Sequence, residues 1–294
     1  MAVVITSPSW GGLRIFGPDA ASWLQGVVTC DVLSVGPGQG AWGSLLSKQG
    51  KILADLHITG QARELIVGVA GGDAALVLST LDGYLVMEDA EIETLAGQFV
   101  AAAGKGALSH LAQLLGPEGP QPSRMPWGVE AGLVQLSQQK WQEQPQLAQQ
   151  LRSADPEQWD EFRISHGLYQ FGVDYDQSDN LHAASLERRT VDWGKGCYVG
   201  QEVVCMQDMR GKVKRRLAVL CAETGVAPSP GASLVPAVTS GNEPQPAALE
   251  DVVGEIKSSA GKWAVATLKA PYFEPGTQLL GEETSLRVQP TSKS

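Results

Sequence analysis

One segment of the chain combines residue types that suit nucleophilic or metal-binding chemistry: residues 195–202 read Lys-Gly-Cys-Tyr-Val-Gly-Gln-Glu. A cysteine acts as a nucleophile or metal ligand only as the thiolate, which nearby positive charge and the amides at a helix start stabilise. Lys195 supplies the charge, and a helix beginning near Gly200 would supply the amides. The glycines permit positive φ angles or the close approach of another molecule. The segment is therefore interpreted as a loop that presents Cys197, although its spacing alone fits a small buried thiol equally well.

This octapeptide resembles the signature of the YgfZ family, which are folate-binding proteins of iron–sulfur cluster maintenance related to the aminomethyltransferase (T-protein) of the glycine cleavage system. The stretch from Gly17 to Asp31 is similar to the amino-terminal pattern of that family, G-x-D-A-x-x-F-L-Q-G-x-x-T-x-D. Arg163, residues 172–174 and residues 180–181 follow in the order that the family shows. The resemblance covers nearly the whole chain and is weakest at residues 115–155 and in the last 80 residues.

The resemblance implies an α+β fold, a T-protein-like ring of three domains around a central hole that holds folate. Two units are mixed α/β and the third is a small C-terminal β-barrel. The expected boundaries are residues 1–45 and 115–210 for the two parts of the first domain, 46–114 for a second domain inserted into it, and 211–294 for the barrel.

The spacing of apolar residues along the chain is compatible with this order of domains. Strands are expected near residues 13–16, 42–46, 51–59, 64–69 and 90–95, and helices at 73–86, 107–115, within the glutamine-rich 138–150 and from 155 to 167. After Lys212 the pattern changes to short strands separated by turns, with a low-hydrophobicity loop at 236–250. Strands and helices that mix without a regular βαβ repeat favour α+β over a doubly wound sheet.

The three parts of a folate suggest which residues would bind it. Its pterin edge suits a carboxylate, its planar rings suit aromatic or long apolar side chains, and its glutamate tail suits arginine or lysine. The candidate folate-binding residues are Asp55, Arg163, Asp174, Asp176, Glu187, Trp193, Tyr198, Gln201 and Glu202, and the candidate catalytic residues are Cys197 and Lys195. The alternatives are that the acids are turn or surface residues, that Arg163 pairs with Asp160 or Glu161, and that the aromatic residues belong to the core.

The chain departs from the family at two positions. The family usually has Leu-Pro-x-Glu about a dozen residues before its signature lysine, where this chain has Leu-His-Ala-Ala at residues 181–184. Ala184 thus replaces the carboxylate expected to hold the pterin, and either Glu187 substitutes for it or folate affinity is reduced. In the T-protein the stretch matching residues 50–55 carries adjacent aspartates, whereas this chain has Ala54 and Asp55, which makes acid–base catalysis of methylene transfer doubtful.

Composition narrows the class of protein. A net charge of −10 and a pI near 4.9 argue against broad binding of nucleic acid. The basic run from Arg210 to Arg216 is the exception, either a solvated strand or an anion-binding rim. Four cysteines without a C-x-x-C pair predict reduced thiols and no metal site held by this chain alone. The absence of a signal-like or long apolar segment predicts a cytoplasmic protein that does not enter a membrane.

The leading hypothesis is a tetrahydrofolate-binding accessory protein for assembly or repair of iron–sulfur clusters in client enzymes. It expects Cys197 to be an accessible thiol within a cavity, ionised more readily because of Lys195, and it leaves open whether the thiol ligates iron, accepts sulfur or forms a mixed disulfide. One alternative is a folate-dependent aminomethyl or one-carbon transferase like the T-protein. The other is an interaction module that keeps the fold and has lost folate.

Overall fold

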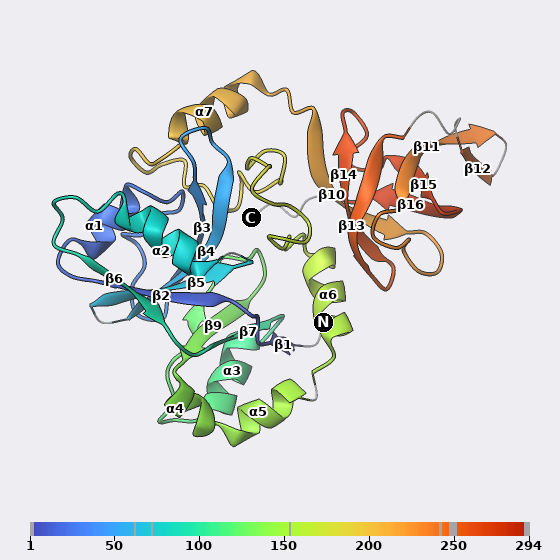
Figure 1. The fold of residues 1–294 in the computed structure, drawn as a ribbon. Coiled ribbons are helices and arrows are strands. Elements are labelled where there is room, and N and C mark those ends of the chain that lie inside the picture. Colours follow the sequence, from blue (N-terminus) through green and yellow to red (C-terminus); the bar gives the residue numbers. More distant parts are fainter. Residues whose placement is uncertain are drawn as a thin grey trace.

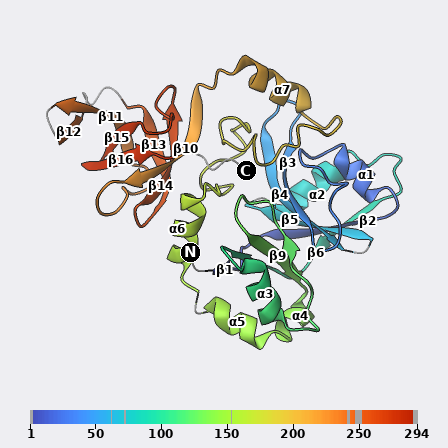
Figure 2. The ribbon, with the colours of Figure 1, turned by 180° about the vertical axis from the view of Figure 1, so that it is seen from behind.

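The computed structural model describes residues 3–61, 63–71, 73–152, 154–240, 243–246 and 252–290. Three β-sheets form three lobes grouped around the middle of the molecule (Figures 1 and 2). Each lobe has a hydrophobic core of its own, and a further cluster of buried residues joins them, with members such as Trp42, Ala101, Phe162 and Val265 drawn from all parts of the chain. The fold therefore brings residues far apart in sequence to a common centre.

The first lobe is built on a five-stranded antiparallel sheet in the order β3-β4-β5-β2-β6. Its strands are β2 (Gly11–Phe16), β3 (Gly40–Leu46), β4 (Ile52–Gln61), β5 (Glu64–Ala70) and β6 (Glu91–Leu95), and its helices are α1 (Ala20–Gln25) and α2 (Ala74–Asp82). β3, β4 and β5 are consecutive and adjacent, which is the meander that their apolar runs predict. Asp73 caps α2 by accepting hydrogen bonds from two backbone amides in its first turn.

The second lobe has a four-stranded sheet in the order β1-β7-β9-β8. Its strands are β1 (Val4–Thr6), β7 (Gln98–Ala103), β8 (Ser123–Arg124) and β9 (Ala131–Leu136), and its helices are α3 (Ala107–Leu115), α4 (Gln138–Gln142) and α5 (Pro145–Arg152). The amino-terminal strand thus pairs with a strand almost 100 residues later. The sheets also group the chain differently from the expected domains, since the expected boundary at 45/46 falls within β3, which pairs with β4 in one sheet.

The third lobe is entirely β in its described part. Its strands are β10 (Arg215–Ala222), β11 (Ser233–Ser240), β12 (Glu243–Pro246), β13 (Gly254–Ala260), β14 (Trp263–Lys269), β15 (Gln278–Gly281) and β16 (Thr284–Val288). Pairing of β11 with both β13 and β15 closes a ring of six strands, with β12 outside it. The expected loop at 236–250 is wrong in part, because residues 236–240 continue β11 and 243–246 form β12. Its other residues lie outside the described ranges.

The segment between the second and third lobes contains two helices and much irregular chain. α6 (Pro156–Ser165) begins at Asp155, whose side chain accepts from the Glu157 amide, and α7 (Gln201–Arg210) begins after Gly200. α6 contacts β1 as well as β13 and β14, so it lies between those two lobes (Figure 1). The loops between α6 and α7 supply most of the residues singled out from the sequence. Among the described residues, none of the helices combines the length and apolar character needed to cross a bilayer.

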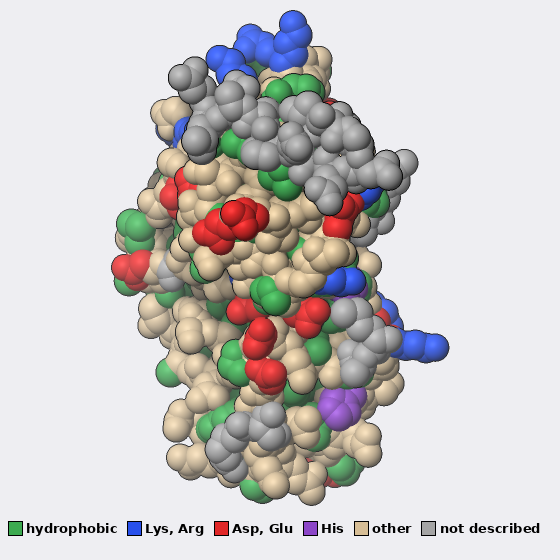
Figure 3. All heavy atoms as spheres, turned by 90° about the vertical axis from the view of Figure 1, so that its right-hand side faces the viewer, with side chains coloured by type: hydrophobic (Ala, Val, Ile, Leu, Met, Phe, Trp, Pro, Cys, Tyr) green, Lys and Arg blue, Asp and Glu red, His purple; other side chains and the backbone are tan. Residues whose placement is uncertain are grey.

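Charge is unevenly distributed on the face that Figure 3 shows. Lysine and arginine side chains gather at its top, the end where Figure 1 places the connection from α7 to β10, and carboxylates are spread over its middle. The basic run accordingly lies on the surface: Arg210, Lys212, Lys214 and Arg215 are all exposed. It is a solvated strip at the start of the third lobe.

Candidate functional site: an aromatic cavity

A cavity of about 500 Å³ lies where the amino-terminal segment, β3, β4, α6 and the loop at 168–171 meet. We call it the aromatic cavity because rings form much of its wall: Trp10, Trp42, His57, Trp127, Trp159, Tyr169 and Phe171. Four of the eight tryptophans in the chain line this one space. Such a wall suits a flat, partly apolar ligand with a few polar groups at its edge.

Asp55 is a buried carboxyl group at this wall. It accepts hydrogen bonds from Trp42 Nε1 at 2.5 Å and from the Tyr175 hydroxyl at 2.6 Å. Burial raises the pKa of Asp55 to about 6, and the two hydrogen bonds oppose that rise. A carboxylate can accept more than two hydrogen bonds, so Asp55 keeps the capacity to bind an N–H group of a ligand.

His57 lies two residues after Asp55 on β4. Successive side chains of a strand point to opposite faces, so Asp55 and His57 share the face that lines the cavity. The His57 ring stacks on Trp10, with centroids 4.3 Å apart and planes 3° from parallel, and its Nδ1 lies 3.3 Å from Trp127 Nε1. Burial lowers the pKa of His57 to about 3. The ring is therefore neutral at physiological pH.

Ala54 directly precedes Asp55 on β4 and belongs to the core of the first lobe. Its side chain points away from the cavity because of the same alternation. The second aspartate of the T-protein pair would have that orientation on this strand. The loss of a carboxylate at position 54 therefore leaves the polar groups of the aromatic cavity unchanged.

Arg163 also lines the aromatic cavity, but its charge is already engaged. Its Nε lies 2.5 Å from Asp160 and its Nη1 lies 2.8 Å from Asp174. Asp174 in turn accepts from the Gln170 amide at 2.8 Å and from the Ser258 hydroxyl on β13. This buried network ties α6, the following loop and the third lobe together, and the expected pairing of Arg163 with Asp160 is present.

Asp176 lies apart from the cavity in an exposed turn. Its Oδ1 accepts from the Ser178 amide at 2.7 Å, and hydrogen bonds from Ser178 lower its pKa. This is the turn-residue alternative that the sequence left open.

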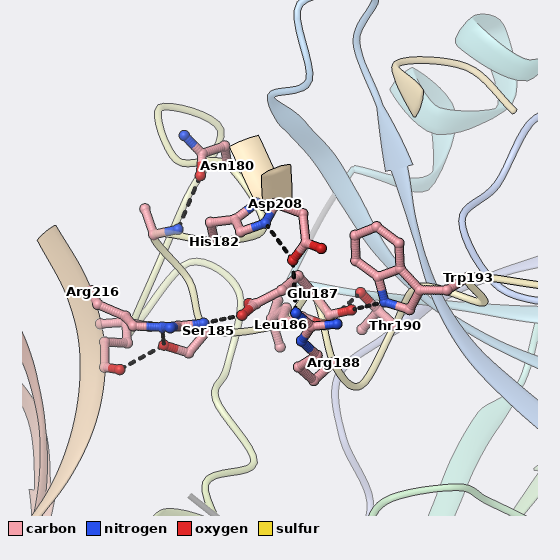
Figure 4. Close-up of polar contacts among 12 residues, drawn as sticks. Asn180, His182, Ser185, Leu186, Glu187, Arg188, Thr190, Trp193, Asp208 and Arg216 are labelled. Carbon is pink, nitrogen blue, oxygen red and sulfur yellow. Dashed lines mark hydrogen bonds and ion pairs between the residues drawn. The ribbon is translucent and has the colours of Figure 1, made fainter. Parts of the chain in front are cut away.

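Glu187 lines a second cavity, and Trp193 lies beside that cavity. This space of about 650 Å³ lies between the loop at 182–189, the end of α7, β10 and the turn at 273–275, and we call it the junction cavity. Figure 4 shows Glu187 paired with Arg216, which also donates to the Ser185 hydroxyl at 3.0 Å, and Arg188 donating to Asp208 at 2.7 Å. These pairs join three segments of the chain to one another.

Trp193 is held by the same loop. Its Nε1 donates to the carbonyl oxygen of Glu187 at 3.0 Å, and the Arg188 guanidinium lies 5.2 Å from its ring centroid (Figure 4). The ring remains 41% exposed. It contributes to the surface beside the junction cavity and does not wall the aromatic cavity.

The signature loop positions its cysteine by fixing the lysine before it. Lys195 Nζ donates to the carbonyl oxygens of Val28 and Cys30, both at 2.7 Å, and burial lowers its pKa. The ammonium thus anchors the loop to the first lobe. Cys197 is exposed, and it is absent from the linings of both cavities described above. The thiol is accessible as the signature suggests, but its expected place within a cavity is wrong for both cavities described here, because the loop carries it on the surface of the described structure.

Tyr198, Gln201 and Glu202 form the transition from this loop into α7. Tyr198 is buried with its ring 5.5 Å from Lys195 Nζ. Gly200 has a φ of 81°, and an added Cβ would come within 2.7 Å of the Ser47 carbonyl oxygen. Gln201 and Glu202 open the helix, where a carboxylate is favourable. Glycine is required at position 200 for both backbone conformation and close packing.

The residues of the aromatic cavity fit the ring system of a folate. The rings provide stacking surfaces, and Asp55 provides a hydrogen-bond acceptor at the buried end. Arg163 is the one cationic side chain among the described residues of the lining, and two carboxylates already pair with it. The cavity thus matches the pterin and aminobenzoyl groups better than the anionic tail.

Metal ligands are not gathered anywhere in the part of the chain that the structure describes. Within those residues no three histidine, cysteine, aspartate or glutamate side chains lie close enough to hold an ion. A single thiol such as Cys197 supplies one ligand, whereas clusters need several. Any cluster bound here would require ligands from elsewhere.

Sequence reasoning missed most of the aromatic cavity. Of the residues it selected, the fold brings Asp55 and Arg163 there, and it missed His57 and the tryptophans. One signal was available: Asp55 and His57 are two residues apart in a predicted strand, so they share a face. No comparable signal in the sequence connects Trp10, Trp127 and Trp159, because their proximity depends on how the lobes pack.

Comparison with known proteins identifies homologues. No family model matches the chain. A protein named "tRNA-modifying protein YgfZ" from Vibrio atlanticus is 23% identical over 227 residues, covering 72% of this chain and 67% of that protein. One of the same name from Photobacterium profundum is 24% identical over 250 residues, covering 79% and 73%. The mitochondrial iron–sulfur cluster assembly factor IBA57 homologue of Pyricularia oryzae is 28% identical over 218 residues, covering 70% of this chain and 54% of that protein.

The fold has a solved counterpart. The glycine cleavage system aminomethyltransferase T of Bartonella henselae superposes with a TM-score of 0.78 over 99% of this chain and 86% of that one, at 18% sequence identity. These findings confirm the resemblance to the YgfZ family and the T-protein-like α+β fold. The match spans only about half the length of the fungal relative.

Proposed function

We propose that this chain, a homologue of the YgfZ and IBA57 proteins, binds tetrahydrofolate in the aromatic cavity and supports assembly or repair of iron–sulfur clusters in client enzymes. Cys197 is its working thiol in this proposal. The relatives supply the class of process, since one is named for iron–sulfur cluster assembly and others for tRNA modification. The residues of the aromatic cavity indicate the class of ligand.

Asp55 is the observation that carries the proposal. It is a buried carboxyl group among aromatic rings, which is costly to retain unless it performs a task. Trp42 and Tyr175 orient it by donating to one oxygen each. In its ionised form it would accept an N–H group of a reduced pterin, while the indole rings would cover the planes of the ligand.

Bound tetrahydrofolate would supply a carrier for one-carbon groups. The chain would bind the ring system, orient it by Asp55 and exclude water from it with the tryptophan wall. Ala184 is fully buried in the central core, so the position expected to carry the pterin-binding carboxylate of the family has become a packing position. Of the other acidic residues in the lining, Asp155 caps α6 and Asp160 pairs with Arg163, which leaves Asp55 as the carboxyl group available to the ligand.

Cys197 would act at the protein surface. Its exposure makes it accessible to a partner protein, and Lys195 holds the loop in place through two backbone carbonyls. One thiol cannot hold a cluster alone, so the chemistry at sulfur requires a client or assembly partner. The separation of Cys197 from the aromatic cavity suggests that folate binding and thiol chemistry are coupled through the partner and not by direct contact.

Titration of purified protein with tetrahydrofolate tests the ligand, for example by isothermal calorimetry under anaerobic conditions. The wild type is expected to bind, and the Asp55→Asn variant is expected to bind more weakly. Absence of binding by the folded wild type would refute the folate part and favour the interaction module that has lost its ligand.

A cell-based assay tests the thiol. Replacing Cys197 by alanine is expected to lower the activity of iron–sulfur enzymes in cells that depend on this chain, whereas Cys205→Ala on α7 serves as the matched control. Equal enzyme activity in cells with Cys197→Ala and with the wild type would end the proposed role for the thiol.

A folate-dependent one-carbon transferase is a second candidate, favoured by the fold and by Asp55. Ala54 does not count against it, because that side chain faces the core of the first lobe. An assay of one-carbon transfer from methylene-tetrahydrofolate separates the two: turnover that depends on Asp55 and not on Cys197 would favour the transferase.

A further inference from the structure

His57 has a defined tautomer because of its neighbour Trp127. An indole nitrogen can only donate a hydrogen bond. Trp127 Nε1 lies 3.3 Å from His57 Nδ1, so Nδ1 must be the acceptor. Burial keeps the ring neutral by lowering its pKa to about 3. The single proton of the neutral ring therefore sits on Nε2.

The ring cannot easily reorient to change this arrangement. Trp10 stacks on it at 4.3 Å, Trp42 lies on it at 5.6 Å with planes 18° apart, and Trp127 meets it edge-on at 5.4 Å. A ring flip would place the Cδ2–H group against the Trp127 N–H group, and moving the proton to Nδ1 would place an N–H group there, so either change would lose the hydrogen bond from Trp127. The four rings thus define a rigid hydrogen-bond donor within the wall of the aromatic cavity.

The Nε2–H group of this donor has no described acceptor. His57 lines the aromatic cavity, and the hydrogen bonds of the described residues include none from its Nε2. This nitrogen is not among the fully buried, unpartnered polar atoms of the described residues, so it reaches the open space of the cavity, where a ligand atom could accept from it. Asp55, a hydrogen-bond acceptor, is on the same face of β4 two residues away, roughly 7 Å along the strand. The cavity therefore offers an acceptor and a donor side by side.

A tetrahydropterin presents the complementary pair. Its N5–H group donates, and the oxygen on C4, which is next to N5 across the ring fusion, accepts. We propose that His57 is a specificity-determining residue that donates Nε2–H to the C4 oxygen of the reduced pterin. This inference rests on the proposed function and adds to it a choice of substrate: the cavity accepts 4-oxo pterins and rejects 4-amino analogues, whose amino group would oppose the fixed N–H group.

Binding of two matched ligands tests this choice. Tetrahydrofolate and tetrahydroaminopterin differ in oxygen or amino at C4 and, with that change, in whether N3 carries a hydrogen. Their dissociation constants are measured for each variant, so that the part of the preference that depends on His57 is isolated. The wild type is expected to prefer tetrahydrofolate by about tenfold or more, since a site built to hydrogen-bond one group leaves a polar atom unpaired with the other. His57→Phe, which keeps a ring for stacking, is expected to lose most of this preference.

Trp127→Phe provides the sharper variant. Without the indole donor, His57 is free to place its proton on Nδ1 and accept at Nε2. The affinity for tetrahydroaminopterin is then expected to rise relative to that for tetrahydrofolate. Trp159→Phe is the matched control, because Trp159 lines the same cavity without bonding to His57, and the ratio of the two affinities should stay at the wild-type value.

A ligand-free readout examines the tautomer itself. The ¹⁵N chemical shifts of the His57 side chain at pH 7 are expected to show a proton on Nε2 in the wild type, and a mixture in Trp127→Phe. A proton on Nδ1 in the wild type would overturn the inference even where folate binds.

These measurements distinguish failure of the proposed role of His57 from failure of folate binding itself. If tetrahydrofolate binds and His57→Phe keeps the full preference for it, the role of His57 is refuted while the proposed function stands. If neither ligand binds the folded wild type, the proposed function and this inference both fail. The inference is supported if His57→Phe loses the preference for tetrahydrofolate, if Trp127→Phe reduces that preference, and if Trp159→Phe leaves it at the wild-type value.

Discussion

In the aromatic cavity, Asp55 and His57 face a space walled by rings and keep hydrogen-bonding capacity for a ligand, whereas in the junction cavity Glu187 is paired with Arg216, and Asp208 with Arg188 (Figure 4). The two spaces are similar in size. They differ in how their carboxylates are partnered: Glu187 and Asp208 form ion pairs with arginines, whereas Asp55 accepts only from uncharged donors. Hydrogen-bonding capacity also remains in the junction cavity, where the His182 ring nitrogens and Glu187 Oε2 are buried without a hydrogen-bond partner among the described residues. Cavity volume alone would therefore not distinguish a binding site from a joint between lobes.

The same comparison explains why acidic residues that look equivalent in the sequence have different partners in the structure. Asp174 and Glu187 both form ion pairs that hold loops in place, Asp174 with Arg163 on α6 and Glu187 with Arg216 on β10. Asp55 has no cationic partner among the described residues, and burial raises its pKa instead. A charge retained in the interior without a counterion is a sign of function, and a buried pair is a sign of architecture.

The largest effect is expected from breaking a pair in the junction cavity. Arg216→Leu would leave the Glu187 carboxylate buried without its partner, and such losses cost about 3 kcal/mol or more of the free energy of unfolding. Urea denaturation measures the change. Tetrahydrofolate affinity of the folded protein should stay at the wild-type value, and Arg215→Leu, at an exposed site on the same strand, should change stability by less than about 0.5 kcal/mol.

The next largest effect concerns acid stability through His57. A histidine whose pKa is lowered on folding from 6.5 to about 3 binds fewer protons in the native state than in the unfolded state, so its contribution to stability falls as pH drops below about 6.5. In His57→Phe, the loss of unfolding free energy between pH 7 and pH 4 should shrink by about 3 kcal/mol. Denaturation at the two pH values measures it, and an unchanged loss would show that His57 titrates normally.

A smaller effect is expected on folate affinity in the aromatic cavity. Asp55→Asn replaces a charged acceptor by a neutral one, and hydrogen bonds to charged groups contribute about 1.5–3 kcal/mol, so affinity for tetrahydrofolate should fall by about 10- to 100-fold. Wild-type affinity should also rise with pH through about 6, as Asp55 ionises. A Glu187→Gln variant that lost affinity as strongly would erase the distinction between the two cavities.

The smallest effect is a gain of stability from the same Asp55→Asn change. Because burial raises the pKa of Asp55 from 3.8 to about 6, the wild-type fold loses stability as pH rises between those values. Removing the charge should therefore stabilise the ligand-free protein at pH 8 by about 1–2 kcal/mol, less than the pKa shift alone implies, because the amide also loses a good partner. Thermal unfolding at pH 8 and pH 4 checks this: the gain should disappear at the lower pH.

Much of the local structure could be predicted from sequence. The meander of β3 to β5, the helices α2, α3 and α6 and most strands of the third lobe follow from apolar periodicity and from turn or capping residues such as Asp155. β7 and β9 were not anticipated. Both are apolar runs whose strand character depends on pairing with each other and, for β7, with β1.

The candidate site was less predictable for the same reason. The fold brings Asp55 and Arg163, both chosen as folate-binding candidates, to the lining of the aromatic cavity. Glu187 and Trp193, chosen for their closeness to the signature in sequence, lie at or beside the junction cavity. Distance along an irregular loop says little about direction in space. The signature lysine is likewise tied to the first lobe across more than 160 residues of chain.

The amino-acid sequence by itself determined the resemblance to the YgfZ family, the α+β class and the strand on which Asp55 and His57 share a face, because these depend on residue types and short-range periodicity. Only the tertiary structure decided which carboxylates are paired and which remain for a ligand. That outcome depends on the packing of three lobes, which brings Trp10, Trp127 and Trp159 around β4 and buries Asp55 and His57 together. Burial and partnership arise from long-range contacts, and it is these that set the protonation state of each group.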